Sequence, residues 1–336
     1  MKILFVFTGG TIGSTVQGDF IGTDHKKPYL LLERYREVYG MDFAFDTVAP
    51  YTNLSENSTG KNLTLLMESV AAAANGYDGI VVTHGTDTLQ YSAAALSYAL
   101  ADIQIPVLLV SSNKTIDDPT ANGLANLRAA IRFIAEVKAP GVFVPYRNEG
   151  EAVTVHRGTR LCESLPFSDA VYSICNSYYG TFLDEAQPFA KNPLYCELAN
   201  ETAALGAQCL QGECEEILRV APYPGNPYRP LPADVRYILH TSYHSGTVNT
   251  ESAVAKAFFA AAKAAGIPVF LTGVEPGAAY DSTRLFAELG IEPLCNIAPI
   301  AAFVKLWMLT AKYKDTPITQ KMLQQSLGGD VVAPLA

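Results

Sequence analysis

The sequence predicts an α/β protein, with a larger N-terminal domain that has a mostly parallel sheet and helices on both faces, and a smaller C-terminal α/β domain. Three observations support this fold class. Short apolar runs alternate with helical patterns through the first half of the chain. The alternation stops over 184–232 and then resumes. The chain of 336 residues is also longer than one hydrophobic core usually supports, about 250–300 residues.

The N-terminal part contains short apolar runs that are typical of strands buried on both faces of a parallel sheet. These predicted strands are 2–7, 44–49, 79–83, 106–111 and 142–145. Helical patterns separate them, at 28–40, 63–75, 89–101 and 123–137. Because right-handed crossovers bring the ends of parallel strands to one edge of the sheet, we expect ligand-binding loops at that edge.

The sequence predicts domains at 1–190 and 233–336, joined by a linker at 191–232. The end of the linker is rich in proline, at Pro222, Pro224, Pro227, Pro230 and Pro232. Proline lacks a backbone N–H donor, so this segment cannot be a helix or a central strand. Beyond it we expect strands at 235–240 and 269–272, and helices at 250–265, 282–289 and 299–311.

Composition excludes several classes of protein. The chain has 24 Lys and Arg against 33 Asp and Glu, a formal charge of −9, which argues against nucleic acid as a partner. The apolar runs at 3–7 and 297–310 are too short for a signal peptide or a membrane span, so no membrane association is expected. The 6 cysteines are scattered, without the spacing of a disulfide framework or a zinc site. We therefore expect a cytoplasmic protein.

Two polar segments follow buried strands. Thr8-Gly9-Gly10-Thr11-Ile12 comes directly after the first strand, where paired glycines let the backbone approach a ligand closely. Thr83-His84-Gly85-Thr86-Asp87-Thr88 comes after the third predicted strand. Capping of the next helix explains one or two of its polar residues, but not the whole cluster. Both segments are therefore predicted to form one functional site.

Together these segments resemble the bacterial-type L-asparaginases, and the resemblance runs over most of the chain. It implies hydrolysis of the side-chain amide of L-asparagine through a threonine nucleophile, without a metal or other cofactor. By this resemblance Thr11 is the nucleophile, on a loop that includes Gly10. Thr86 positions the attacked amide, beside Gly85, and Asp87 binds the α-amino group of the substrate.

The resemblance extends to a third loop. Ser55 and Glu56, after the second strand, correspond to the pair that binds the α-carboxylate and α-amino groups of the substrate. These roles are chemically reasonable, because a hydroxyl nucleophile must lose its proton to a neighbour and the oxyanion needs preorganised donors. The resemblance also implies a homodimer or homotetramer with the site between subunits.

One position departs from the family pattern. Where a lysine normally activates the second threonine, this chain has Glu163. An anion there raises the pKa of a nearby hydroxyl, whereas a cation lowers it. Three hypotheses follow. Glu163 is itself the base, or Lys114 after the fourth strand replaces the missing cation, or the site acts on a modified asparagine or other amide, or only binds amino acids.

Overall fold

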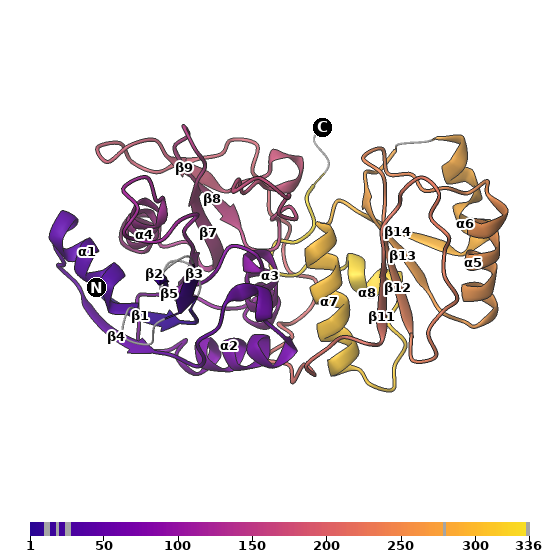
Figure 1. Cartoon of the computed structure of the whole chain (residues 1–336), viewed down its shortest axis with the longest axis horizontal. Coiled ribbons are helices and arrows are strands. Elements are labelled where there is room, and N and C mark those ends of the chain that lie inside the picture. The colour runs from indigo at the N-terminus through magenta and orange to yellow at the C-terminus, as the bar shows by residue number, and fades with distance from the viewer. Residues whose placement is uncertain (10–13, 18–19, 24–27, 278–279, 334–336) are drawn as a thin grey trace.

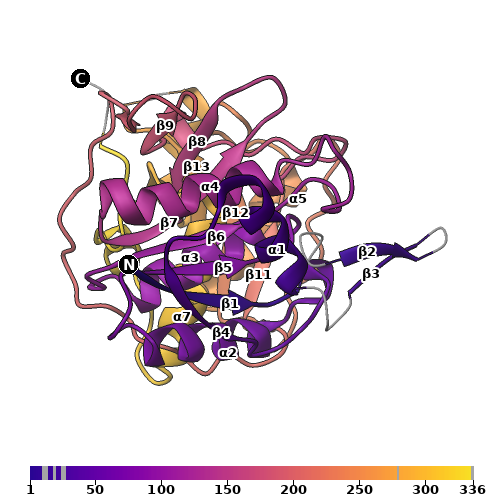
Figure 2. The same cartoon turned by 90° about the vertical axis from the view of Figure 1, so that its left-hand side faces the viewer.

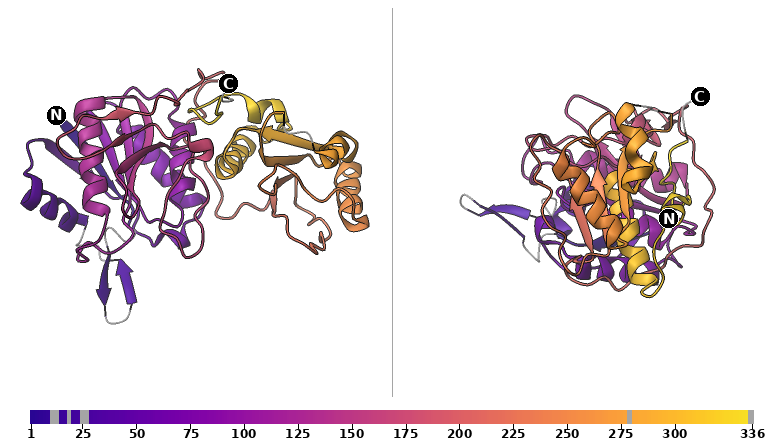
Figure 3. Two further views of the ribbon diagram at one scale, coloured as in Figure 1. Left: turned by 90° about the horizontal axis from the view of Figure 1, so that it is seen from above. Right: turned by 90° about the vertical axis from the view of Figure 1, so that its right-hand side faces the viewer.

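The structure, a computed structural model, describes residues 1–9, 14–17, 20–23, 28–277 and 280–333. Two sheets form two layered units that lie side by side, with the N-terminal unit on the left of Figure 1 and the C-terminal unit on the right. The view from above in Figure 3 shows the same separation. The predicted α/β fold class is confirmed.

The larger sheet has the strand order β10-β9-β8-β7-β6-β5-β1-β4. Its parallel strands are β1 (Lys2–Phe7), β4 (Ala44–Val48), β5 (Gly79–Thr83), β6 (Pro106–Val110) and β7 (Gly141–Arg147). Three antiparallel strands extend it, β8 (Val153–Arg157), β9 (Gly180–Phe182) and β10 (Ala190–Lys191). The parallel strands therefore end together at one edge.

Helices cover both faces of the larger sheet. They are α1 (Pro28–Tyr39), α2 (Gly60–Ala72), α3 (Leu89–Ala99) and α4 (Gly123–Arg132). Strand β1 shows why both faces are apolar: Ile3 and Phe5 pack in one core with residues of α1 and α4, whereas Leu4 and Val6 pack with α2 and α3. Because successive strand side chains point to opposite faces, an almost unbroken apolar run satisfies both cores.

The smaller sheet is parallel, with the order β11-β12-β13-β14. Its strands are β11 (Ile217–Val220), β12 (Tyr237–Thr241), β13 (Val269–Val274) and β14 (Ile291–Cys295). Strand β11 lies inside the range 191–232 that was predicted as a linker, so part of that range belongs to the second sheet. The proline-rich end of the range, which follows β11, contains no helix or strand.

Helices of the smaller unit divide between its two faces. They are α5 (Ala253–Ala264), α6 (Phe286–Leu289), α7 (Pro299–Lys312) and α8 (Gln320–Gln324). Helices α5 and α6 supply Phe258, Phe259 and Phe286 to the apolar core on the face of the smaller sheet that lies away from α7. Helix α7 packs against α3 on its other side and so lies between the two sheets, as Figure 1 shows. The two units therefore share one continuous apolar interface.

Some predicted elements differ in detail. The helix expected over 123–137 is α4 followed by a wider π-type turn at Phe133–Val137, which ends at Lys138 with a φ of 56°. The helix expected over 282–289 is a 3-10 turn at Asp281–Leu285 followed by the single turn of α6. Tighter or wider turns at helix ends change the hydrogen-bonding pattern without changing the path of the chain.

A two-stranded hairpin projects from the larger unit, as Figure 2 shows. It consists of β2 (Ser14–Gln17) and β3 (Phe20–Thr23), which pair in an antiparallel register. In the sequence, the hairpin follows Thr8-Gly9-Gly10-Thr11-Ile12, the first glycine-rich segment. In the part of the chain that the structure describes, no helix has the length and apolar character needed to cross a membrane.

Candidate functional site

The first glycine-rich segment leaves β1 beside the loop that follows β4. Thr8 accepts a backbone hydrogen bond from Asn53 at 3.0 Å, and Gly9 pairs with Asn53. Gly9 has a φ of +99°, and a Cβ atom there would lie 2.3 Å from the Asn53 carbonyl oxygen. Only glycine satisfies both the dihedral angle and this close approach. Glycine at position 9 therefore lets the end of β1 pass directly against the loop that follows β4.

The side chain of Thr8 connects this segment to β5. Its hydroxyl donates to the carbonyl of Thr83 at 2.6 Å in a buried position. Strands β4 and β5 both flank β1 in the sheet. The loops that follow these three strands therefore meet at one edge, as the topology of parallel sheets predicts.

Ser55 and Asp87 meet across these loops. The buried Ser55 hydroxyl donates to Asp87 Oδ2 at 3.1 Å, and the Thr88 hydroxyl donates to the Ser55 carbonyl at 3.0 Å. Asp87 is exposed, and so is Glu56, the neighbour of Ser55. The arrangement leaves a carboxylate facing solvent with one oxygen already held by a hydroxyl. Such a carboxylate is oriented to receive a cationic group.

His84 is the buried residue of the second segment, and its ring forms hydrogen bonds on both of its nitrogen atoms. It is 2% exposed, its Nδ1 donates to the Gly85 carbonyl at 2.8 Å, and its Nε2 accepts from the Ser92 hydroxyl at 2.8 Å. Burial lowers the pKa of His84, which keeps the ring neutral. The ring therefore fixes the backbone around Gly85 as a packing and hydrogen-bonding residue.

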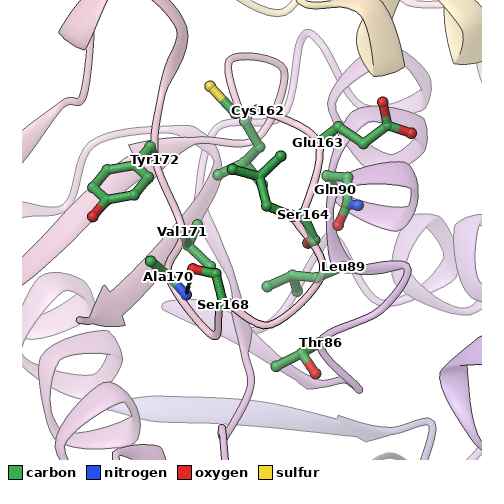
Figure 4. Close-up of a pocket in the computed structure, with 12 residues that line it drawn as sticks. Thr86, Leu89, Gln90, Cys162, Glu163, Ser164, Ser168, Ala170, Val171 and Tyr172 are labelled. Atoms are coloured by element: carbon green, nitrogen blue, oxygen red, sulfur yellow. Dashed lines mark hydrogen bonds between the residues drawn. The ribbon is translucent and has the colours of Figure 1, made fainter. Parts of the chain in front are cut away.

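Thr86 lies at the border of two cavities. One of about 220 Å³ and another of about 280 Å³ adjoin it, and both use the loop that includes Ser164 and Val171. The first cavity also has the apolar side chains of Leu89 and Leu161. Figure 4 shows Thr86 at one end of this first cavity. The hydroxyl of Thr86 is therefore next to space large enough for part of a small molecule.

Glu163 lines the same cavity but points out of it. In Figure 4 its side chain leaves the cavity on the side opposite to Thr86. Its carboxylate lies 3.3 Å from Nη2 of Arg219, a residue of β11. The carboxylate of Glu163 is therefore engaged by a cation from the smaller unit rather than by Thr86.

Lys114 contacts its own loop. Its ammonium donates to the Thr120 hydroxyl at 2.7 Å and lies 3.7 Å from Asp118 Oδ2. The side chains of Thr120 and Asp118 follow Lys114 within one short segment, so they hold its charge locally. The structure thus brings Ser55, Asp87 and Thr86 to one edge, and leaves Lys114 bound within its loop.

Two predicted residues, Gly10 and Thr11, lie outside the described residues. Gly9 is the last described residue of the first segment before that gap. Among the residues with described positions, no three His, Cys, Asp or Glu side chains gather in the way that a bound metal ion needs.

Comparison with known proteins identifies the family. The family model described as "Asparaginase, N-terminal" matches residues 2–189, which include every loop described above. The chain belongs to the asparaginase family. It is therefore an amidohydrolase, and the family resemblance inferred from the two polar segments is confirmed.

Two curated relatives show which proteins this chain resembles in sequence. The chain is 28% identical over 344 residues to a subunit of the glutamyl-tRNA(Gln) amidotransferase of Pyrobaculum aerophilum, covering 97% of this chain and 81% of that protein. It is 32% identical over 181 residues to an L-asparaginase of Thermococcus kodakarensis, covering 51% of this chain and 53% of that one. The relatives of this chain therefore have two different names, and their sequence identities to it are 28% and 32%.

Solved asparaginase structures share the fold. The thermostable L-asparaginase from Thermococcus kodakarensis superposes with a TM-score of 0.78 at 22% identity, over 99% of this chain and 100% of that chain. L-asparaginase I from Vibrio cholerae gives a TM-score of 0.73 at 21% identity, over 99% of both chains. The two-sheet architecture is thus that of the asparaginase fold.

Sequence reasoning missed Arg219 as a neighbour of the site. It lies in a range predicted to be a linker, and 56 positions separate it from Glu163. The only sequence signal was the reversed charge at position 163, which calls for a compensating cation without saying where that cation is. The pairing of β11 with β12 brings Arg219 to this place.

Proposed function

We propose that this chain hydrolyses the side-chain amide of L-asparagine to aspartate and ammonia, with Thr11 as the nucleophile. The observation that carries the proposal is the hydrogen bond of 3.1 Å between Ser55 and Asp87, beside the end of β1. It joins two of the three loops that the family resemblance assigns to the site. The third loop begins at Gly9, held against Asn53.

The substrate is a zwitterion, and the site has a group for each charge. Asp87 accepts the α-ammonium group, and the exposed carboxylate of Glu56 assists it. Loop amides donate to the α-carboxylate, and the single hydroxyl proton of Ser55 turns from Asp87 to the α-carboxylate when the ammonium group binds Asp87. This division of roles places the side-chain amide toward Thr86 and the segment with Thr11. The amides around Gly10 and Gly85 are the proposed donors to the oxyanion.

The reaction has two halves. The hydroxyl oxygen of Thr11 attacks the amide carbon, its proton passes to the departing nitrogen, and ammonia leaves an acyl-enzyme ester. Water then attacks the ester carbon, releases aspartate and restores the hydroxyl of Thr11. Thr86 positions the amide for the first half. Because an alcohol is a weak nucleophile at its ordinary pKa, proton transfer during attack is essential.

The group that activates the threonines at this site remains a prediction with two named candidates, Glu163 as the base and Lys114 as the cation that replaces the family lysine. Glu163 lines the cavity beside Thr86, but its carboxylate faces Arg219. Lys114 follows β6 at the same sheet edge, with its ammonium on Thr120. A Glu163→Gln variant and a Lys114→Met variant test these roles separately, since loss of a general base lowers kcat by about 10²–10⁴-fold.

We also propose that the chain is a homodimer or homotetramer in the cytoplasm. Beside Thr86 the loop presents Leu165 and Phe167, which are 69% and 110% exposed. Exposed apolar side chains at the rim of a site are typical of a surface that a second copy covers. Free thiols at all six cysteines are consistent with a reducing compartment. Light scattering of the wild type and of Phe167→Ser tests the assembly.

A second candidate function is hydrolysis of another amino-acid amide. Two observations favour it: the relatives named as glutamyl-tRNA(Gln) amidotransferase subunits, and the cavity of about 220 Å³ next to Thr86. That cavity offers space for a group attached to the amide nitrogen or for a longer side chain. A third candidate, a binding protein without turnover, follows from the departure at Glu163.

One assay separates these candidates. Ammonia release is measured with L-asparagine, L-glutamine and a panel of N-substituted asparagines, together with the melting temperature in the presence of L-aspartate. The proposed function predicts the highest kcat/KM with L-asparagine. A preference for another amide supports the second candidate. Stabilisation by L-aspartate without ammonia from any amide identifies a binding protein.

A further inference from the structure

Two aromatic residues hold Arg219 in addition to its contact with Glu163. Its Nη1 donates to the Tyr91 hydroxyl at 2.9 Å, and its guanidinium carbon lies 5.2 Å from the centre of the Phe303 ring. Tyr91 and Phe303 also pack against each other, with ring centres 6.1 Å apart and planes at 82°. The guanidinium group is therefore fixed by α3 and α7, at the junction of the two units.

This position connects the junction to the catalytic edge. Tyr91 lies in the first turn of α3, and its backbone N–H donates to the Thr88 carbonyl at 3.2 Å. Thr88 in turn donates to the Ser55 carbonyl. Glu163 contacts Arg219 from the loop that forms the wall of the cavity beside Thr86. Arg219 thus binds the residue that occupies the position of the family lysine.

The direction of the Glu163 side chain has a chemical consequence. A second anion turned toward Thr86 and Asp87 raises the pKa of the hydroxyls there and repels the α-carboxylate of a substrate. The cavity beside Thr86 has room for that orientation. The ion pair with Arg219 draws the carboxylate the other way.

We propose that Arg219 is a positioning residue that holds the Glu163 carboxylate away from Thr86, so that the negative charge at position 163 stays outside the reaction pocket. This inference rests on the proposed function for its kinetic effect, but not for its structural effect. By this inference, Arg219 on β11 of the smaller unit supplies a positive charge near position 163, where the family has a lysine. It also predicts that Glu163 is harmful to the reaction when Arg219 is removed.

Three variants of the full chain test the inference through kcat/KM for L-asparagine. Arg219→Ala is expected to lower kcat/KM by about tenfold, and adding Glu163→Gln to it is expected to raise kcat/KM again by about fivefold. Arg236→Ala is the matched control, because Arg236 directly before β12 pairs with Glu216 directly before β11 at 2.7 Å and has the same side-chain exposure of 36% as Arg219. The control is expected to keep the wild-type kcat/KM.

Each other outcome overturns the inference. Wild-type kcat/KM in Arg219→Ala shows that the pair is irrelevant to the site. A loss that Glu163→Gln does not relieve, in a variant that melts like the wild type, shows a packing role for Arg219. A further loss in the double variant shows that Glu163 is itself the base.

A ligand-free crystal structure of Arg219→Ala separates this inference from the proposed function. Glu163 turned into the cavity beside Thr86 supports the inference even if the wild type hydrolyses no amide. An unchanged Glu163 overturns it even if the wild type is an active asparaginase.

Discussion

The Ser55 hydroxyl donates to Asp87 Oδ2 at 3.1 Å and so joins the loop after β4 to the loop after β5. The two strands lie on either side of β1, the strand that leads to Thr11. A hydrogen bond between residues 32 positions apart thus holds together the two loops that flank the first glycine-rich segment. Asp87 keeps its other oxygen for a ligand, because the hydroxyl occupies Oδ2.

Ser55→Ala is expected to weaken substrate binding. A hydrogen bond to a charged group contributes about 1.5–3 kcal/mol, so KM for L-asparagine should rise by about tenfold or more while kcat changes less. Steady-state ammonia release measures both constants. Ser242→Ala is the matched control, since its hydroxyl donates to the Gly273 carbonyl in the smaller unit. An unchanged KM in Ser55→Ala contradicts the proposed role.

Gly9→Ala is expected to damage both stability and activity. Its Cβ atom would meet the Asn53 carbonyl oxygen at 2.3 Å, and the residue has a positive φ. We expect a loss of about 2 kcal/mol or more in the free energy of unfolding, and ammonia release at least about tenfold slower. Gly76→Ala has a similar φ of +109° with nothing within 4 Å, so it isolates the dihedral cost, about 1 kcal/mol. Equal losses in both variants contradict the role of close packing at Gly9.

His156 predicts a pH dependence of stability. It is 2% exposed on β8, bonded to the Ser173 hydroxyl at 2.8 Å, and burial lowers its pKa from 6.5 to about 3. Below pH 6.5 the unfolded chain therefore binds a proton that the folded chain does not, so folded-state stability falls as pH falls. Between pH 7.0 and 5.5 His156 contributes about 1 kcal/mol of this loss.

Urea unfolding of the wild type and of His156→Gln at the two pH values measures this contribution. Glutamine does not titrate, so the fall in the free energy of unfolding should be about 1 kcal/mol smaller in the variant. His244→Gln, which removes another histidine, serves as the control for the substitution itself. If His156→Gln has the same pH slope as the wild type, His156 is not the residue that titrates.

The buried pair of Lys305 and Asp330 predicts a large effect on the free energy of unfolding. Their side chains are 2% and 0% exposed, their charged atoms lie 2.8 Å apart, and Tyr98 also donates to Asp330. Lys305→Met leaves a buried carboxylate without its cation, which costs about 3–5 kcal/mol. Arg34→Ala breaks the exposed pair with Glu37 and should cost less than about 1 kcal/mol. Urea unfolding distinguishes the two; similar values in both variants contradict the account of the buried pair.

The sequence predicted those strands and helices whose hydrophobic pattern is uninterrupted. Runs such as β1 and β5 are almost entirely apolar, so their burial on both faces followed directly from composition. Strand β14 was missed because Glu292 and Pro293 interrupt its apolar pattern, and the structure accommodates them at partly buried positions. The antiparallel strands β8 to β10 were missed because they are short and contain polar and charged residues.

The residues of the site also separate into those that the sequence pattern predicts and those that it does not predict. Ser55, Thr86 and Asp87 follow parallel strands, so the sheet topology alone predicted that they share an edge. The contact of Glu163 with Arg219 was beyond such reasoning, because it depends on how β11 joins the second sheet and how that unit packs on α3. Local pattern predicts elements and edges, whereas contacts between units depend on packing across the whole chain.

The most direct test of the account is ammonia release from L-asparagine by the wild type, Thr11→Ala and Thr11→Ser. The account predicts that Thr11→Ala lowers kcat by about 10³-fold or more, that Thr11→Ser keeps a measurable part of it, and that both variants still bind L-aspartate. Wild-type kcat in Thr11→Ala would contradict the central claim, because another group would then have to attack the amide.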